Sequence, residues 1–376
     1  MAIYLDHAAA TPLDADVLAQ MQPYLTTQFY NPSATYLAAK EVRSVLDDAR
    51  ARTAKVLGVR PGEVVFTAGA TEANNLAIHG VMAKNPGKKL LVSAVEHASV
   101  LEAAKQYDYD LIPVDSFGHV DVQALKKLIT KDVVLVSCMW INNEVGTIAY
   151  MATISKIIQE VRGQRVMNGD FTPLYLHSDA AQAPNLITLN PKRQHVDLLS
   201  LNGGKIYGPK QSGALYVAGG IELEPLVYGG GQEHGLRSGT ENVANIVGFS
   251  YALQKAAELR PTEEVRLEAL QKMFIDLLKE SVPKAELTVP VTNAYNFVHL
   301  MVPGVDNERL MMELDEAGIQ CAVGSACSAS SEEPSHVLRA IGLSDEQAQS
   351  SLRFTMGRST TTEDIEKTVS VLAKLV

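Results

Sequence analysis

The segment Asn202-Gly203-Gly204-Lys205 follows an apolar run, Val196 to Leu201, that is typical of a buried strand. Glycines at the end of a strand let the backbone approach a bound group closely. A lysine beside them, held in a partly desolvated pocket, loses its proton readily, so its amine can form a Schiff base with a carbonyl compound. Most single loop lysines are only solvated surface groups, so Lys205 is a candidate that other residues must support.

An aspartate stands at the end of an earlier strand-like segment. Residues Pro173 to Leu176 lead into His177-Ser178-Asp179-Ala180-Ala181-Gln182. Pyridoxal phosphate (PLP) needs one residue that anchors its aldehyde and one acid that keeps its ring nitrogen protonated. Lys205 and Asp179 are suited to these two tasks, and the pair therefore points to PLP.

Strand-like and helix-like segments alternate upstream of Lys205. This alternation predicts an α/β fold with a mainly parallel sheet that has helices on both faces. Ligands bind such sheets at the carboxyl ends of the strands. The candidate residues that follow strand ends are Thr71, His97, Asn143, Asp179 and Lys205. The predicted strands are 63–67, 89–94, 111–114, 133–136, 173–176 and 196–201, with a helix at 121–130.

The segment Ala68 to Asn75 joins the predicted strand 63–67 to a helix. A turn of small residues before a helix presents free backbone N–H groups and the positive end of the helix dipole to an anion. Thr71 adds a hydroxyl group, although a threonine at this position is often only a helix cap. The turn is therefore a candidate phosphate site, to which Ala70 also belongs.

A cysteine with unusual surroundings lies near the C-terminus. Cys327 occurs in Val323-Gly324-Ser325-Ala326-Cys327-Ser328-Ala329-Ser330-Ser331, a run of small residues that offers little for packing. An exposed thiol in such a loop can attack one group and then deliver sulfur to another. Cys138, at the end of an apolar strand, is expected in the core, and Cys321 is given no role.

Arg353 lies between apolar neighbours in Ser351-Leu352-Arg353-Phe354-Thr355. A charge in such a strand needs a partner. Its planar guanidinium can hold a carboxylate with two parallel hydrogen bonds. Two interpretations remain, a grip on a substrate carboxylate and an ion pair inside the protein.

Composition argues against several classes of protein. The 33 lysines and arginines against 43 acids give a net charge of −10, which argues against direct nucleic-acid or anionic-membrane binding. No run approaches about 18 apolar residues, and Asp6 interrupts the apolar start, so we expect neither a membrane span nor a signal peptide. Three dispersed cysteines do not form a disulfide framework, which is consistent with a cytoplasmic protein.

The pattern changes after a long predicted helix, Asn242 to Leu259, which we expect to end at Arg260-Pro261. A chain of 376 residues is long for one compact core, so two domains are expected. The later segments indicate a smaller α+β domain. They are a helix at 263–279, strands at 296–300 and 319–323, and a last helix.

The lysine and aspartate segments, the Cys327 loop and the string GGGQEHGLRSGTEN at 229–242 resemble the cysteine desulfurases of the NifS/IscS type. These belong to the class V aminotransferase group of fold-type I PLP enzymes. The resemblance covers essentially the whole chain. It implies a large PLP-binding domain over residues 15–259 and a small domain, formed by 1–14 and 260–376, that carries the Cys327 loop.

The resemblance implies a role for each candidate residue. Lys205 would hold PLP and carry the Cα proton, and Asp179 would pair with the ring nitrogen. The Cys327 thiolate would attack the sulfur of L-cysteine, leaving L-alanine and a persulfide for a sulfur-acceptor protein. Arg353 would grip the substrate carboxylate with help from Asn31. The other cofactor contacts are His97 on the ring, where it also serves acid–base steps, Gln182 and Asn143 at the phenolic oxygen, and Ala70, Thr71, Asn202 and Thr240 at the phosphate.

Thr240 would reach the phosphate from the opposite subunit, so the resemblance also implies a homodimer. The chain departs from the family pattern near the lysine. Asn202 and Gly204 stand where the family has serine and histidine, and Gln211 stands at a usual glycine position. We therefore expect PLP to bind more weakly than in relatives, with the chemistry retained.

Two other functions remain open. Another enzyme of the same group, such as a selenocysteine lyase or an aminotransferase, would share the lysine site, although the Cys327 loop argues against a plain aminotransferase. A non-catalytic sulfur-relay or scaffold partner with weakened PLP binding is favoured only by the altered phosphate residues. Candidate sulfur acceptors are an iron–sulfur scaffold and a tRNA- or cofactor-thiolating enzyme.

Overall fold

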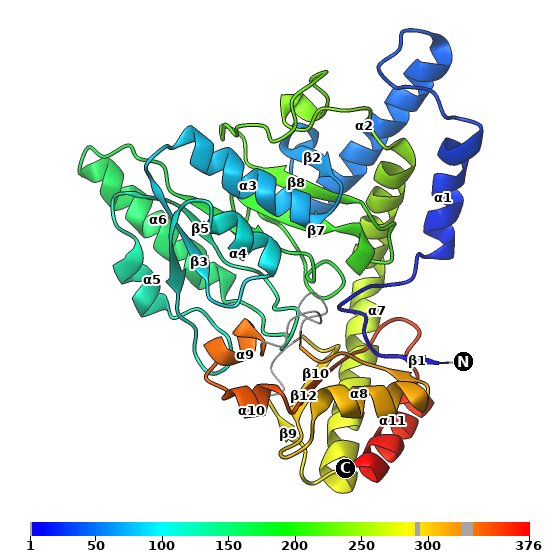
Figure 1. Cartoon of the computed structure of the whole chain (residues 1–376). Coiled ribbons are helices and arrows are strands. Elements are labelled where there is room, and N and C mark those ends of the chain that lie inside the picture. Colours follow the sequence, from blue (N-terminus) through cyan, green and yellow to red (C-terminus); the bar gives the residue numbers. More distant parts are fainter. Residues whose placement is uncertain (1, 290–293, 325–333) are drawn as a thin grey trace.

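The computed structural model describes residues 2–289, 294–324 and 334–376. One long helix, α7 (Val243–Ser281), connects two groups of strands. The larger sheet and its helices lie around the first half of α7, and the smaller sheets lie around its second half (Figure 1). Among the described residues, no helix combines the length and apolar character that a membrane span requires.

The larger sheet has seven strands in the order β2-β8-β7-β6-β5-β3-β4. β8 alone runs in the direction opposite to the other six strands, so the predicted mainly parallel sheet is confirmed. β8 itself was not predicted, because the glycine and polar residues between it and β7 hide the short apolar run. The strands are β2 Val64–Thr67, β3 Lys89–Ser93, β4 Asp108–Ile112, β5 Val133–Ser137, β6 Tyr175–Asp179, β7 Leu198–Asn202 and β8 Gly213–Val217.

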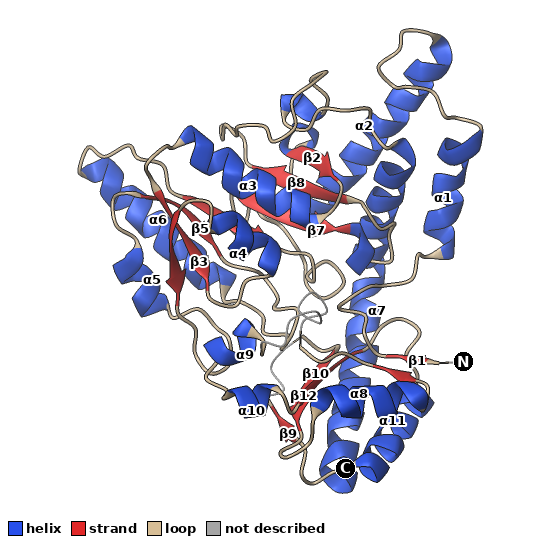
Figure 2. Cartoon of the chain, in the orientation of Figure 1, coloured by secondary structure: helices blue, strands red, loops and turns tan. Residues whose placement is uncertain are grey.

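Helices cover both faces of this sheet, as parallel strands with buried faces require (Figure 2). On β3, Leu90 and Val92 pack in one apolar cluster with α3 and α4, while Leu91 faces the cluster that includes α1, α2, α6 and α7. The alternation follows the two-residue period of a strand. The helices are α1 Ala15–Thr26, α2 Leu37–Leu57, α3 Ala70–Lys84, α4 Ala98–Ala104, α5 Val122–Leu128 and α6 Met151–Met167.

The predicted helix break at Arg260-Pro261 is wrong, because α7 continues through Pro261 to Ser281. Proline removes one helical hydrogen bond, which ordinarily ends or kinks a helix. Here the two halves are each held by packing, with Phe249 buried on one side of the proline and Phe274 on the other. Arg260 Nη1 also donates to the carbonyl oxygens of Pro184 and Ile187, which ties the middle of the helix to the larger sheet region.

The smaller sheets combine the first strand of the chain with strands from its last third. β10 lies between β9 and β12 in an antiparallel sheet, while β1 pairs in parallel with β11. The N-terminal strand thus joins C-terminal elements, which is what the discontinuous small domain requires, although the bounds 15–259, 1–14 and 260–376 stay a prediction. The elements are β1 Ile3–Tyr4, β9 Glu286–Leu287, β10 Phe297–Met301, β11 Ile319–Gln320, β12 Ser351–Thr355, α8 Asn307–Glu316, α9 His336–Ala340, α10 Asp345–Ala348 and α11 Thr362–Leu375.

Candidate active site

A pocket at the carboxyl ends of the parallel strands brings together most of the predicted site residues. We name it the front pocket, and the space in it that is open to water molecules is about 110 Å³. Residues at or after the ends of five strands of the larger sheet contribute to its wall, as expected for a ligand site of an α/β sheet. The predicted residues that line it are Ala70, Thr71, His97, Asn143, Asp179, Gln182, Asn202, Lys205 and Arg353.

Lys205 ends a single helical turn, η2 (Gly203–Lys205), that follows β7. Its Nζ donates hydrogen bonds to the carbonyl oxygens of Ala8, at 2.8 Å, and Ala9, at 2.5 Å. The turn needs glycine at 203, because a Cβ there would lie 2.1 Å from Ser212 Oγ. The amine is therefore held at the pocket wall by the N-terminal segment, which the sequence analysis did not assign to the site.

Asp179 ends β6 and is only 5% exposed. Its Oδ2 accepts a hydrogen bond of 2.7 Å from Asn74 Nδ2, and its Oδ1 accepts one of 2.8 Å from the Ala181 N–H. Both bonds fix the orientation of the carboxylate at the pocket. Asn74 was missed, although an asparagine on the buried face of a helix is itself a signal that a polar partner lies nearby.

His97 caps the N-terminus of α4. Its Nδ1 accepts the Ser99 N–H at 3.1 Å, so in the neutral ring the hydrogen is on Nε2. Burial lowers the pKa of His97, although the negative charge of Asp179 acts in the opposite direction. The ring is thus neutral at neutral pH and able to donate from Nε2, which suits a group that lies against an aromatic cofactor.

Arg353 is 1% exposed, and its guanidinium reaches the front pocket. Nη2 forms a 2.6 Å ion pair with Asp6 Oδ1, and Nη1 donates to the Asn143 carbonyl at 2.8 Å. Nε is buried and has no hydrogen-bond partner among the residues that the structure describes. The internal ion pair that the sequence left open is therefore present, and one buried donor remains available for a ligand.

The candidate phosphate residues lie at the N-terminus of α3 and beside η2. Ala70 and Thr71 open the helix, where free N–H groups favour an anion. Asn202 Oδ1 accepts the Gly204 N–H at 3.0 Å, which leaves the amide NH₂ of Asn202 as its group for an anion. Gly204 has no positive φ, and a Cβ there would meet nothing closer than Asn202 Oδ1 at 3.4 Å.

The room for a side chain at Gly204 leads to a prediction about how tightly the protein retains PLP. We expect Gly204→His to tighten PLP binding by about tenfold, because a charge-assisted hydrogen bond contributes roughly 1.5–3 kcal/mol and about 1.4 kcal/mol is tenfold. Dialysis followed by the visible absorbance of bound cofactor measures the change. Gly204→Leu is the matched control, since it fills similar space without a donor. Equal retention in the histidine and leucine variants would show that the lost histidine is already replaced by other donors.

Among the described residues, two predicted site residues, Asn31 and Thr240, do not line the front pocket. Cys327 lies outside the described residues. Asn31 is exposed, and its Oδ1 accepts the Ser33 N–H, while Thr240 is exposed on the glycine-rich segment. Their roles toward substrate and cofactor stay predictions, and the predicted role of Thr240 depends on the opposite subunit that the resemblance implies.

The two described cysteines are poor nucleophiles. Cys138 is fully buried, as predicted, and burial raises the pKa of its thiol well above the usual value. Burial, with a smaller contribution from Asp6, raises the pKa of Cys321 to about 12. Neither thiol forms much thiolate at neutral pH, so Cys327 is the remaining candidate of the chain.

A lysine, a fixed aspartate and a buried arginine around one pocket of a mainly parallel sheet are typical of PLP-dependent enzymes. The family model described as Aminotransferase class-V matches residues 3–368, and the chain belongs to this family. Its relatives place it among the cysteine desulfurases. "Cysteine desulfurase IscS" of Dictyoglomus turgidum is 40% identical, with 100% of this chain and 94% of that protein covered.

Solved structures agree with this assignment. A structure titled "NIFS-LIKE PROTEIN" superposes with a TM-score of 0.91 at 30% identity, covering 100% of this chain and 99% of that one. A second, titled "SspA in complex with cysteine", gives a TM-score of 0.80 at 31% identity, covering 94% and 98%. The expected fold class and family are therefore confirmed.

Proposed function

We propose that this chain uses PLP to remove sulfur from L-cysteine, giving L-alanine and a persulfide on Cys327. The observation that carries the proposal is the shared pocket of Lys205, Asp179 and Arg353. The Lys205 amine can bind an aldehyde, the Asp179 carboxylate can neutralise a pyridinium, and the Arg353 guanidinium can bind a carboxylate. Together they fit a PLP enzyme that acts on an amino acid.

The donor set of the front pocket fits PLP. Lys205 would hold the aldehyde carbon, and Asp179, fixed by Asn74, would hold the ring nitrogen. The N-terminus of α3 with Thr71 and the amide of Asn202 would hold the phosphate. Bound there, PLP supplies an electron sink that makes the bonds at the substrate Cα and Cβ easier to break.

Three side chains of the protein act on the substrate, each in a different step. Arg353 binds and orients the carboxylate, to which its buried Nε, a donor with no acceptor among the described residues, donates a hydrogen bond. Lys205 accepts the proton from Cα and returns one. The Cys327 sulfur forms a bond to the substrate sulfur while the bond from Cβ to sulfur breaks. Cβ takes up a proton, so the substrate leaves as alanine.

A homodimer and a sulfur-acceptor protein are parts of the same proposal. Large apolar side chains are exposed on α1, on the segment after it and at the start of α2, and a second copy of the chain would cover them. They are Leu18, Leu25, Phe29, Tyr36 and Leu37. A second copy could also bring Thr240 to the phosphate of its neighbour. We place the reaction in the cytoplasm, where thiols stay reduced and an acceptor can take the persulfide sulfur.

The test is an assay of alanine and sulfide with the PLP-loaded protein, L-cysteine and a thiol reductant. Stoichiometric alanine and sulfide support the proposal, and stimulation by an iron–sulfur scaffold or a thiolation enzyme identifies the acceptor. Faster turnover of L-selenocysteine would favour a selenocysteine lyase. Absence of alanine from a protein that retains its cofactor absorbance would contradict the proposal and favour a non-catalytic partner.

The role of Arg353 leads to a separate prediction. Arg353→Lys keeps a positive charge beside Asp6 but loses the planar donor pair, so we expect kcat/KM for L-cysteine to fall at least about tenfold. Cysteamine, which lacks the carboxylate, is the matched ligand, and its binding to the loaded protein should stay unchanged. An equal loss for both ligands would mean that Arg353 has only a structural role.

A further inference from the structure

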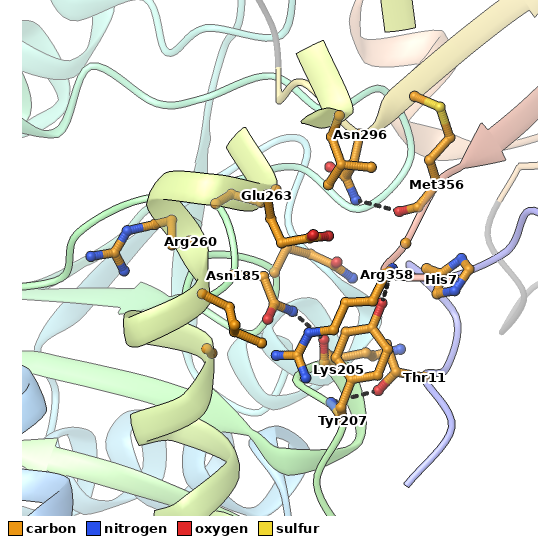
Figure 3. Close-up of a pocket in the computed structure, with 16 residues that line it drawn as sticks. His7, Thr11, Asn185, Lys205, Tyr207, Arg260, Glu263, Asn296, Met356 and Arg358 are labelled. Atoms are coloured by element: carbon orange, nitrogen blue, oxygen red, sulfur yellow. Dashed lines mark hydrogen bonds between the residues drawn. The ribbon is translucent and has the colours of Figure 1, made fainter. Parts of the chain in front are cut away.

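A second cavity shares Lys205 and Gln182 with the front pocket and is otherwise lined by different residues (Figure 3). We name it the rear chamber. Its wall comes from the N-terminal segment, the segments after β6, β7 and β12, the residue before β10, and α7. The polar side chains that decide its chemistry are His7, Tyr207, Asn296 and Arg358.

Three buried polar atoms on this wall have no hydrogen-bond partner in the described part of the chain. They are Nε2 of His7, Oδ1 of Asn296 and Nη2 of Arg358. His7 is only 4% exposed. Buried polar atoms are almost always paired, either with protein or with ordered water. Three orphaned atoms around one cavity therefore indicate that the cavity holds a polar ligand.

Two of these atoms are acceptors. His7 Nδ1 lies 3.0 Å from the Thr355 carbonyl oxygen, which can only accept, so Nδ1 carries the hydrogen and Nε2 carries a lone pair. Burial lowers the pKa of His7, which favours this neutral ring. Asn296 Nδ2 donates to the Met356 carbonyl, so Oδ1 is its acceptor.

Donors lie on the same wall. Arg358 Nη2 can only donate. Tyr207 Oη accepts the Arg358 N–H at 2.7 Å and keeps its own hydrogen for another partner. A Cβ on Gly357 would lie 2.3 Å from His7 Nε2 and 2.5 Å from Tyr207 Oη, so the two side chains converge beside residue 357.

Tyr207 is held in this place at a conformational cost. Its φ is 63°, in the left-handed region that bulky residues rarely adopt. The Thr11 hydroxyl accepts its N–H at 2.8 Å, and the Arg358 guanidinium covers its ring at 3.9 Å. Strained residues that the surroundings hold in place are concentrated at functional sites.

The charges around the chamber favour a neutral ligand. Arg358 Nη1 is paired with Asp14, and Glu263 is paired with Arg266. Arg260 directs its guanidinium to backbone carbonyls and to Thr188. The space open to water molecules is about 30 Å³. Since one water needs roughly 10–15 Å³ and two to four polar partners, the chamber fits about two waters.

We propose that the rear chamber binds ordered water that joins Tyr207, His7 and Arg358 to Lys205 and exchanges the protons of that lysine with solvent. The inference rests on the proposed role of Lys205 as the carrier of the Cα proton. When cofactor and substrate fill the front pocket, Lys205 still borders the rear chamber. One proton passes from the lysine ammonium to water and one returns, so the exchange needs no other reactant.

The water itself is tested in the cofactor-free protein. A high-resolution crystal structure should show ordered water within hydrogen-bond distance of His7 Nε2 and Arg358 Nη2. In Tyr207→Phe, the water that accepts from the phenol should be lost or shifted. A dry chamber in the unaltered protein would overturn the proposal, whatever the reaction that the enzyme catalyses.

The proton exchange is tested with L-alanine in D₂O, where proton NMR follows loss of the Cα hydrogen. We expect Tyr207→Phe to slow this exchange about tenfold, the effect of one hydrogen bond of about 1.4 kcal/mol. Tyr216→Phe is the matched control, because Tyr216 on β8 is also buried and lies outside both cavities. His7→Leu, which removes an acceptor beside Tyr207, should also slow it.

The outcomes separate this inference from the proposed function. Cα exchange involves Lys205 and the cofactor but not Cys327, so loss of sulfur transfer with normal exchange counts against the desulfurase activity alone. Equal exchange rates in Tyr207→Phe, His7→Leu and Tyr216→Phe, at matched cofactor loading, would overturn the role of the rear chamber.

Discussion

Lys205→Ala is expected to remove both the visible absorbance of lysine-bound PLP and all formation of alanine. The covalent anchor of the cofactor is lost, and so is the base that moves the Cα proton. The fold should persist, because Ala8 O keeps a second donor, Gln182 Nε2 at 2.9 Å. Absorbance spectra, alanine assays and thermal unfolding of the same preparation measure the three properties.

Lys210→Ala is the matched control for this variant. Lys210 lies in the same turn region, and its Nζ donates to the Thr11 carbonyl at 2.7 Å, outside the front pocket. Its removal should leave cofactor absorbance and turnover close to those of the unaltered protein. If Lys205→Ala kept the absorbance, or if both variants lost it alike, Lys205 would not be the anchor.

The parallel sheet and the positions of the strand ends could be predicted from the sequence. β3, β5 and β7 are buried on both faces, so each is a mostly apolar segment that ends at a polar residue. Parallel strands bring their carboxyl ends to one edge, and that rule predicts that His97, Asp179 and Lys205 lie close together. Each strand and its end is encoded in a short segment of sequence, so it can be predicted without knowledge of the rest of the fold.

The N-terminal part of the site could not be predicted in this way. Ala8 and Ala9 act on Lys205 through carbonyl oxygens, which every residue has, so their side chains give no signal. Asp6 pairs with Arg353 across 347 residues, and only the assembled sheets bring them together. The same limit explains the error at Pro261, where burial on both sides of the proline outweighed the local preference for a break.

Cys327→Ser is expected to separate cofactor chemistry from sulfur transfer. The serine hydroxyl has nearly the same shape but lacks a nucleophilic sulfur, so no persulfide can form on residue 327. Lys205, Asp179 and Arg353 are unchanged, and L-cysteine should still alter the absorbance of the loaded protein. We expect alanine formation to fall to the background rate and the protein mass to show no added sulfur.

Cys321→Ser is the matched control for this variant, because Cys321 and Cys327 are only six residues apart in the sequence. The Cys321 thiol, with a pKa of about 12, is protonated at neutral pH and cannot compete as the nucleophile. Its replacement should leave persulfide and alanine at the levels of the unaltered protein. Alanine production by Cys327→Ser would instead require another acceptor for the sulfur. Since burial also raises the pKa of Cys138, that acceptor would have to be an added thiol attacking the substrate directly.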